Sequence, residues 1–253
     1  MYPLIITSLA ACLLASCSVT DWQAKTPWTP TPSLQNTVNT ERTTSVVSDT
    51  TRETLRLAYS EERLAEDVYT LMVAKYPQFT EVMNIINSEE KHSEAVGRLL
   101  DARGIPRPTD YGSYSGTYEV LKKMIDTSLT QAIEAGVMVE AWDIYHLLEE
   151  YKKIEDSDVR QVFENIGGGS FNHLRAFLRL AQENNYTVTT DYARYMNADE
   201  VNSTGSLKSK MTDLLKANNL PSYGTQGGGN GDGRGPMGGN GGGRGNGMGS
   251  MNR

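Results

Sequence analysis

The sequence has 253 residues and a formal net charge of −7 at pH 7. This acidic balance argues against nucleic acid as a main partner, because phosphate binding requires a basic surface. Both ends of the chain have compositions unlike folded protein, so the folded part is shorter than the chain.

Residues 1–16 have the pattern of a secretory signal peptide, an apolar run followed by small residues. The stretch "LASC", which ends at Cys17, resembles the lipobox of bacterial lipoproteins, in which the cysteine is lipidated. No Lys or Arg precedes the apolar run, and "LAAC", which ends at Cys12, also fits but leaves a very short apolar segment. We predict an exported lipoprotein of the cell envelope, attached to the membrane through Cys17, and to the outer membrane if the source has two. An uncleaved anchor or a wrongly assigned start codon is the alternative.

Two segments are predicted to be disordered. Residues 17–50 are rich in Thr, Ser and Pro and lack a periodic apolar pattern, as expected of an extended tether. Residues 224–253 form a Gly-rich tail that cannot bury a core. Its two Gly-Arg-Gly pieces lack aromatic residues, so no nucleic acid partner is expected there either.

The region between these segments shows helical rather than strand periodicity, so the predicted fold class is all-α. Pro77 and Gly104 end the first two helices, and Ser128 with Gln131 has the pattern of a capping box at the start of another. The predicted helices cover Thr51–Tyr76, Thr80–Arg103, Tyr118–Ile125, Leu129–Ile154 and Asp158–Glu183.

Four of these helices are long and have short or moderate links. They predict an antiparallel four-helix bundle over residues 51–195. A C-terminal extension with a short helix follows at residues 196–223.

Each long helix carries ionisable residues on its apolar stripe. Such residues cost on the order of several kcal/mol in a core unless something pairs with them. The residues on the stripes are Glu62, Glu89, His92, Glu140 and His173. Glu61 competes with Glu62 for the inner position, and Asp143 lies one position to the side of Glu140.

This set contains carboxylates and imidazoles with no matching inward Lys or Arg. Clustered carboxylates repel one another and raise each other's pKa unless cations lie between them. Two divalent metal ions would compensate them, and oxygen ligands with imidazole suit iron or manganese. A salt-bridge network is the alternative. If repulsion dominates, Glu89→Gln should weaken metal binding but stabilise the metal-free protein.

Four motifs in this order, "SEERLAEDVY", "SEEKH", "VEAWDIY" and "SFNHLRAF", resemble a ferritin-like family catalogued as domain of unknown function 2202. The resemblance covers Thr51 to Tyr195. It implies a ferritin-like bundle in which Glu62, Glu89, His92, Glu140 and His173 are metal ligands. It also favours Glu62 over Glu61, because rubrerythrin-like motifs place Ala three and Tyr seven residues after the ligand.

The last motif departs from the family pattern, because Ser170 stands where a carboxylate is familiar. Asp143 could supply the missing oxygen, and a site with one metal ion, or none, is the alternative to two. Glu61, Tyr69 and Ser170 are expected to surround the ligands. The three glycines at 167–169 cost a helix on the order of 2 to 3 kcal/mol against alanine, which predicts a bulge or break there.

Two functions follow as hypotheses. The first is a dimetal oxidoreductase that reacts with oxygen or peroxide and takes electrons from an external donor, since the chain has no electron-delivery module. The second is a metal-binding or scaffold lipoprotein without turnover. In either case the chain could assemble as a homodimer. His146 lies off the inner line and is expected at the surface or an interface.

Overall fold

The structure is a computed structural model, and it describes residues 47–223. The predicted signal peptide, Cys17, nearly all of the tether and the Gly-rich tail lie outside the described residues. Within 47–223 every regular element is a helix, so the predicted all-α class is confirmed. No helix in this range is both long enough and apolar enough to cross a membrane.

The first two long helices form a hairpin. Helix α2 spans Asp49–Lys75, and Ser48 caps it by accepting a hydrogen bond from the backbone N–H of Thr51, the third residue of the helix. A four-residue link that contains Pro77 leads to α3, which spans Thr80–Ala102. Gly104 follows with a φ of +62°, in the left-handed region that favours glycine after a helix.

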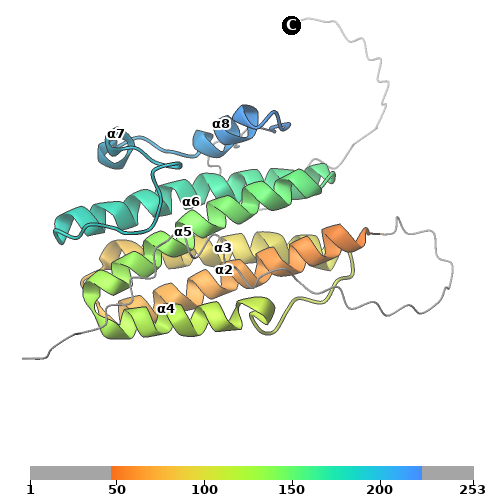
Figure 1. The fold of residues 1–253 in the computed structure, drawn as a ribbon. Helices are drawn as coiled ribbons and strands as arrows, with labels where there is room; N and C mark the ends of the chain where they lie inside the picture. The colour runs from red at the N-terminus through yellow and green to blue at the C-terminus, as the bar shows by residue number, and fades with distance from the viewer. Residues whose placement is uncertain (1–46, 224–253) are drawn as a thin grey trace, which may run out of the picture.

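A crossover connects this hairpin to the second one. It contains a 3-10 turn, η1 (Gly112–Tyr114), and helix α4 (Ser115–Thr127), which begins three residues earlier than predicted. Helix α4 buries Leu121 and Ile125 and packs against α2 and α5 (Figure 1).

The second hairpin joins α5 (Leu129–Lys153) to α6 (Ser157–Glu183) through a three-residue link. Ser128 caps α5 by accepting the N–H of Gln131 at 3.2 Å. Helix α6 runs without interruption through residues 167–169, so the predicted bulge or break at the glycines is wrong. The reason is that neighbouring groups approach the helix backbone closely on that side, as described below.

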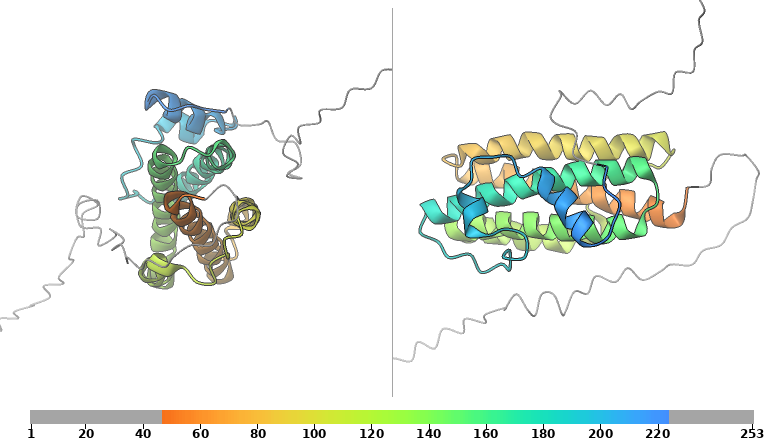
Figure 2. Two further views of the ribbon diagram at one scale, coloured as in Figure 1. Left: turned by 90° about the vertical axis from the view of Figure 1, so that its right-hand side faces the viewer. Right: turned by 90° about the horizontal axis from the view of Figure 1, so that it is seen from above.

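The two hairpins pack against each other as a helix bundle (Figure 2). Helix α3 contacts α6 and α2 contacts α5, so all four long helices border one interior. Gly136 on α5 makes this approach close, since a Cβ there would lie 2.3 Å from the ring of Phe177 on α6.

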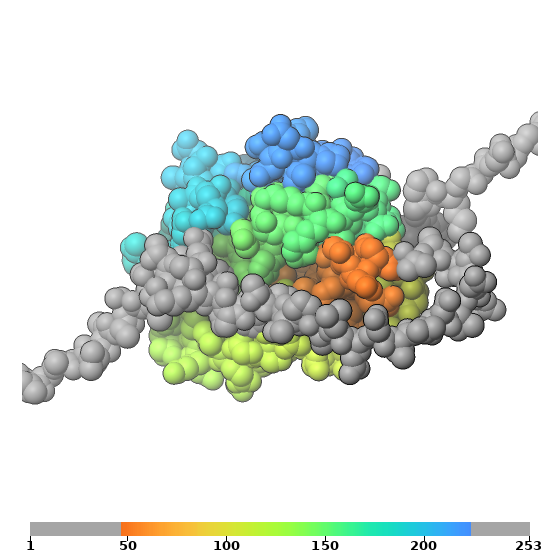
Figure 3. All heavy atoms as spheres, turned by 45° about the vertical axis from the view of Figure 1, so that its right-hand side comes forward, coloured from red at the N-terminus to blue at the C-terminus, as the bar shows by residue number. Residues whose placement is uncertain are grey.

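The C-terminal extension contains two short helices, α7 (Ala198–Asn202) and α8 (Ser209–Ala217), where one was predicted. Both lie on the outer side of α6 (Figure 3). Arg179 on α6 donates from Nε to the carbonyl of Val201 at 2.8 Å, and Arg175 donates to the carbonyl of Ser203 at 3.3 Å. These bonds attach the extension to the bundle.

Candidate metal centre

Five ionisable side chains from the long helices meet inside the bundle, and we call them the cluster: Glu62 on α2, Glu89 and His92 on α3, Glu140 on α5 and His173 on α6. Four of the five are buried, and the side chain of His92 is 13% exposed. Helical periodicity explains their meeting, because each residue lies on the same face of its helix as the buried apolar residues.

Glu89 lies between the two histidines. Its Oε2 is 2.9 Å from Nδ1 of His92, and its Oε1 is 2.7 Å from Nδ1 of His173. The two imidazole rings are stacked, with their centroids 5.6 Å apart. One carboxylate therefore faces both histidines, with a different oxygen toward each.

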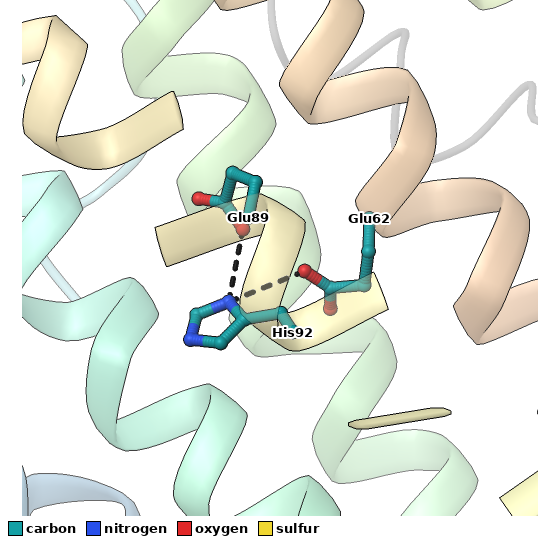
Figure 4. A group of neighbouring side chains, drawn as sticks. All are labelled: Glu62, Glu89 and His92. Carbon is teal, nitrogen blue, oxygen red and sulfur yellow. Dashed lines mark hydrogen bonds and ion pairs between the residues drawn. The ribbon is translucent and has the colours of Figure 1, made fainter. Parts of the chain in front are cut away.

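Each histidine also faces a second carboxylate. Oε2 of Glu62 is 3.3 Å from Nδ1 of His92, and Oε2 of Glu140 is 3.6 Å from Nδ1 of His173. Figure 4 shows Glu62 and Glu89 directed toward the imidazole of His92. The candidate ligand atoms form two groups, and within each group all atoms lie within 4.8 Å of one another. The groups are Glu62, Glu89 and His92, and Glu89, Glu140 and His173. They share Glu89, which is the arrangement that two cations bridged by one carboxylate would need.

Several polar atoms here have no hydrogen-bond partner. Among the buried side-chain atoms that the structure describes, Oε1 of Glu62, Oδ1 of Asp143 and Nδ1 of His173 are unpaired, and Arg160 provides the one other case. Nδ1 of His173 is nevertheless 2.7 Å from Oε1 of Glu89, with which it forms an ion pair when the imidazole is protonated. A buried polar group without a partner costs about 1–3 kcal/mol, so the cluster has capacity for another species that binds these atoms.

Asp143 and Ser170 bond to each other rather than to the cluster. Ser170 donates from Oγ to Oδ2 of Asp143 at 2.5 Å, and both residues are buried. Neither belongs to the two ligand groups. The carboxylate of Asp143 on α5 thus lies beside Ser170 on α6, without joining either ligand group.

Tyr69 holds one carboxylate of the cluster in place. Its hydroxyl donates to Oε1 of Glu140 at 2.5 Å, which leaves Oε2 of Glu140 directed toward His173. The ring of Tyr69 packs 5.1 Å from that of Phe177, centroid to centroid. The packing of the helices thus fixes the donor that orients Glu140.

Glu61 and His146 form a pair beside the cluster that the sequence reading missed. Glu61 is buried, and its Oε1 is 3.1 Å from Nδ1 of His146. His146 was expected at the surface or an interface, and its side chain is 27% exposed while it packs against Trp142, with ring centroids 4.6 Å apart. A signal was present: His146 follows Asp143 by three residues, so both lie on adjacent turns of one face of α5.

Burial dominates the electrostatics of the carboxylates. It raises the pKa of Glu62 to about 8, although attraction to His92 opposes the shift. Burial, followed by repulsion from Glu62 and Glu61, holds the pKa of Asp143 well above its usual range. Without a cation, Glu62 therefore binds a proton at neutral pH, and the ionised form of Asp143 is disfavoured.

Glu89 behaves in the opposite way. Burial favours its neutral form, but attraction to His173 and His92 outweighs burial and lowers its pKa. Burial favours the neutral form of His92, but the carboxylates of Glu89 and Glu62 outweigh burial and raise the pKa of His92 to about 10. Burial opposes protonation of His173, but attraction to Glu89 and Glu140 outweighs it and raises the pKa of His173 well above its usual range. An anionic Glu89 thus lies between two imidazoles that favour their protonated forms, so we now expect Glu89→Gln to destabilise the metal-free protein.

No Lys or Arg pairs with the carboxylates of the cluster or with Asp143 in the described range. Protons are thus the only positive charges that this range supplies to the interior site. The carboxylates border a narrow gap, and its lining residues are Glu61, Glu62, Ala65, Glu89, Val139, Glu140 and Asp143. Carboxylate oxygens and imidazole nitrogens are donors that fit iron or manganese, and the gap suits an ion rather than an organic molecule.

Comparisons with known proteins cover the helical region. Residues 51–204 match a family described as an uncharacterized protein domain, DUF2202. The uncharacterized protein MJ0754 of Methanocaldococcus jannaschii is 32% identical over 168 residues, which cover 63% of this chain and 90% of that relative. The crystal structure of hypothetical protein MJ0754 from Methanococcus jannaschii DSM 2661 has a TM-score of 0.57 and 28% identity to this chain, and the match covers 66% of this chain and 99% of that one.

Proposed function

This chain belongs to the DUF2202 family of protein domains, and we propose that its helix bundle is ferritin-like and binds two ions of iron or manganese at the cluster. One observation carries the proposal: Glu89 directs one carboxylate oxygen toward Nδ1 of each histidine, at 2.9 Å to His92 and at 2.7 Å to His173, so the two candidate ligand groups share this residue. A carboxylate shared between two ligand groups suits a bridge between two cations.

The ligands divide into two sets that share a bridging carboxylate. Glu62, Glu89 and His92 would hold one ion, and Glu89, Glu140 and His173 would hold the other. The unpaired Oδ1 of Asp143 is a further candidate ligand atom outside these two sets. With Ser170 in place of a second Glu-x-x-His carboxylate, the site has one bridging Glu rather than two.

The surrounding residues support a reaction at such a site. Iron or manganese bound here would exchange electrons with oxygen or peroxide. Tyr69 fixes Glu140 through its hydroxyl, and the buried helices keep bulk water away. Glu61 can take a proton at Oε1 and pass it to Nδ1 of His146, whose ring is partly exposed. We propose this pair as the proton route between the gap and solvent.

A metal-binding or scaffold protein without turnover is the second candidate. It is favoured by the absence of cysteine from residues 18–253, because the chain then has no thiol site of its own for electron delivery. An oxidoreductase would therefore depend on an external electron donor. Redox cycling of the bound ions by peroxide separates the two candidates, since only the enzyme should return to the reduced state repeatedly with a donor present.

Export and membrane attachment through Cys17 complete the proposal. They rest on the pattern of residues 1–17 and place the bundle in the cell envelope, on the outer membrane if the source has two. Residues 18–46 would act as the tether that separates the bundle from the membrane. A homodimer is compatible with this arrangement.

Elemental analysis tests metal binding. The full chain would be reconstituted with ferrous iron or with manganese and freed of excess metal, and two equivalents are expected, one for each ligand group. Glu89→Ala should lose both ions because Glu89 is shared, whereas exposed Glu119→Ala is the control and should keep both. Binding of less than about a tenth of an equivalent of either metal would overturn the proposal.

A further inference from the structure

Three consecutive glycines occupy the middle of α6, at positions where a helix gains from almost any other residue. All three are buried, and the helix passes through them without a break. Their role therefore lies in what approaches the helix at each position.

Two of the glycines accommodate the C-terminal extension. A Cβ at Gly167 would lie 2.9 Å from Cγ of Met211, and a Cβ at Gly168 would lie 2.7 Å from the carbonyl oxygen of Lys208. Met211 lies in α8, and Lys208 directly precedes this helix. Gly167 and Gly168 therefore allow the extension to lie directly on the α6 backbone.

Gly169 faces the cluster instead. A Cβ there would lie 2.7 Å from Cε1 and 2.8 Å from Nε2 of His92, distances that real Cβ atoms do not show. His173, on the same helix, would not clash with this Cβ, because its Cε1 would be 3.9 Å away. The close contact thus concerns one histidine of the two.

The imidazole of His92 is enclosed on both sides. On one side Nδ1 faces Oε2 of Glu89 at 2.9 Å and Oε2 of Glu62 at 3.3 Å. On the other side Cε1 and Nε2 rest against the α6 backbone at Gly169, and Oγ of Ser88 is 3.4 Å from Nε2. A side chain at position 169 would push the ring toward the carboxylates or turn it, and either movement changes where Nδ1 points.

We propose that Gly169 is a positioning residue for the metal-binding imidazole of His92. By leaving the ring in contact with a bare helix backbone, it holds Nδ1 toward Glu62 and Glu89 and defines the first ligand group. The second group, around His173, does not depend on it. This inference rests on the proposed function, because the group it positions is a proposed metal ligand.

The first test is manganese binding to the full chain, measured by isothermal titration calorimetry. In Gly169→Ala one ion should bind at least about tenfold weaker, while the other stays within about twofold of wild type. Gly116→Ala is the matched control, because no group lies within 4 Å of its Cβ position in α4, and it should keep both affinities. Unchanged binding of both ions to Gly169→Ala would overturn the inference. Failure of wild type to bind manganese or iron would instead overturn the proposed function.

A double-mutant cycle on the metal-free protein tests the contact itself. Gly169→Ala should lower the Tm in the wild-type background but raise it in the His92→Ala background, where the ring is gone and alanine favours the helix. A purely structural role, unrelated to His92, would lower the Tm equally in both. If Gly169→Ala alone fails to fold, folding of His92→Ala/Gly169→Ala still supports the contact, and failure of the double variant contradicts it.

Discussion

Glu62→Gln should stabilise the metal-free protein at neutral pH and weaken metal binding. The substitution keeps the shape of the side chain and removes its ability to ionise. In the native protein without metal, burial raises the pKa of Glu62 from 4.5 to about 8. The unfolded chain therefore binds fewer protons than the native protein between these values, so the free energy of unfolding falls as pH rises through this range.

The magnitude follows from that interval. At pH 7 the native carboxyl is protonated while the unfolded one is ionised, over about 2.5 pH units at about 1.4 kcal/mol each. This sets a maximal gain of about 3.5 kcal/mol for Glu62→Gln at pH 7 and almost none at pH 4. For a domain of this size, the gain corresponds to a rise in Tm of roughly 7 to 14 °C.

The assay is thermal unfolding with chelator at pH 4 and pH 7, followed by circular dichroism at 222 nm. Glu119→Gln on the exposed side of α4 is the control, and it should show no such pH-dependent gain. A Glu62→Gln protein that is less stable than wild type at pH 7 would refute the reasoning. It would mean that an ionised Glu62 stabilises the native protein through His92, as in a structural salt bridge.

Three further predictions concern protons, a loop and the chain start. Metal binding should release protons, since the pKa of His92 is raised to about 10 and that of Glu62 to about 8, so affinity should rise with pH between about 6 and 8 in titration calorimetry with paired buffers. Glu134 accepts five hydrogen bonds from the segment after α6, so Glu134→Gln should lower the free energy of unfolding by about 2 kcal/mol or more in urea denaturation. These hydrogen bonds outweigh burial and lower its pKa, so its charge stabilises the fold at neutral pH and the deficit should shrink as pH falls below about 4. Palmitate labelling in cells should disappear in Cys17→Ser and persist in Cys12→Ser. The reverse result would show that Cys12, and not Cys17, is the lipidated residue.

The helices could be predicted from the sequence because their signals are local. Apolar residues at helical spacing, a capping serine at Ser128 and a glycine after α3 define the long helices to within about two residues. The same periodicity decides which side chains share a face, and this is why Glu62, Glu89, Glu140 and the two histidines could be proposed as neighbours before any distance was known.

Distances between helices could not be predicted in this way, because they depend on packing between residues far apart in the sequence. The contact between Gly136 and Phe177 sets how closely α5 approaches α6. The pairing of Glu61 with His146 spans 85 residues, and the contact of Gly169 with His92 spans two helices. The glycines were read as a break because their cost to a helix is visible in the sequence, whereas the groups they accommodate are not.

The ligand assignment can be tested most directly by anomalous diffraction at the iron edge, on crystals of the full chain reconstituted with ferrous iron. Two anomalous peaks are predicted in each chain, one bordered by Glu62, Glu89 and His92 and the other by Glu89, Glu140 and His173. Glu89→Ala crystals treated in the same way should show neither peak. Iron located away from these residues, or no anomalous peak in fully reconstituted wild-type crystals, would contradict the assignment.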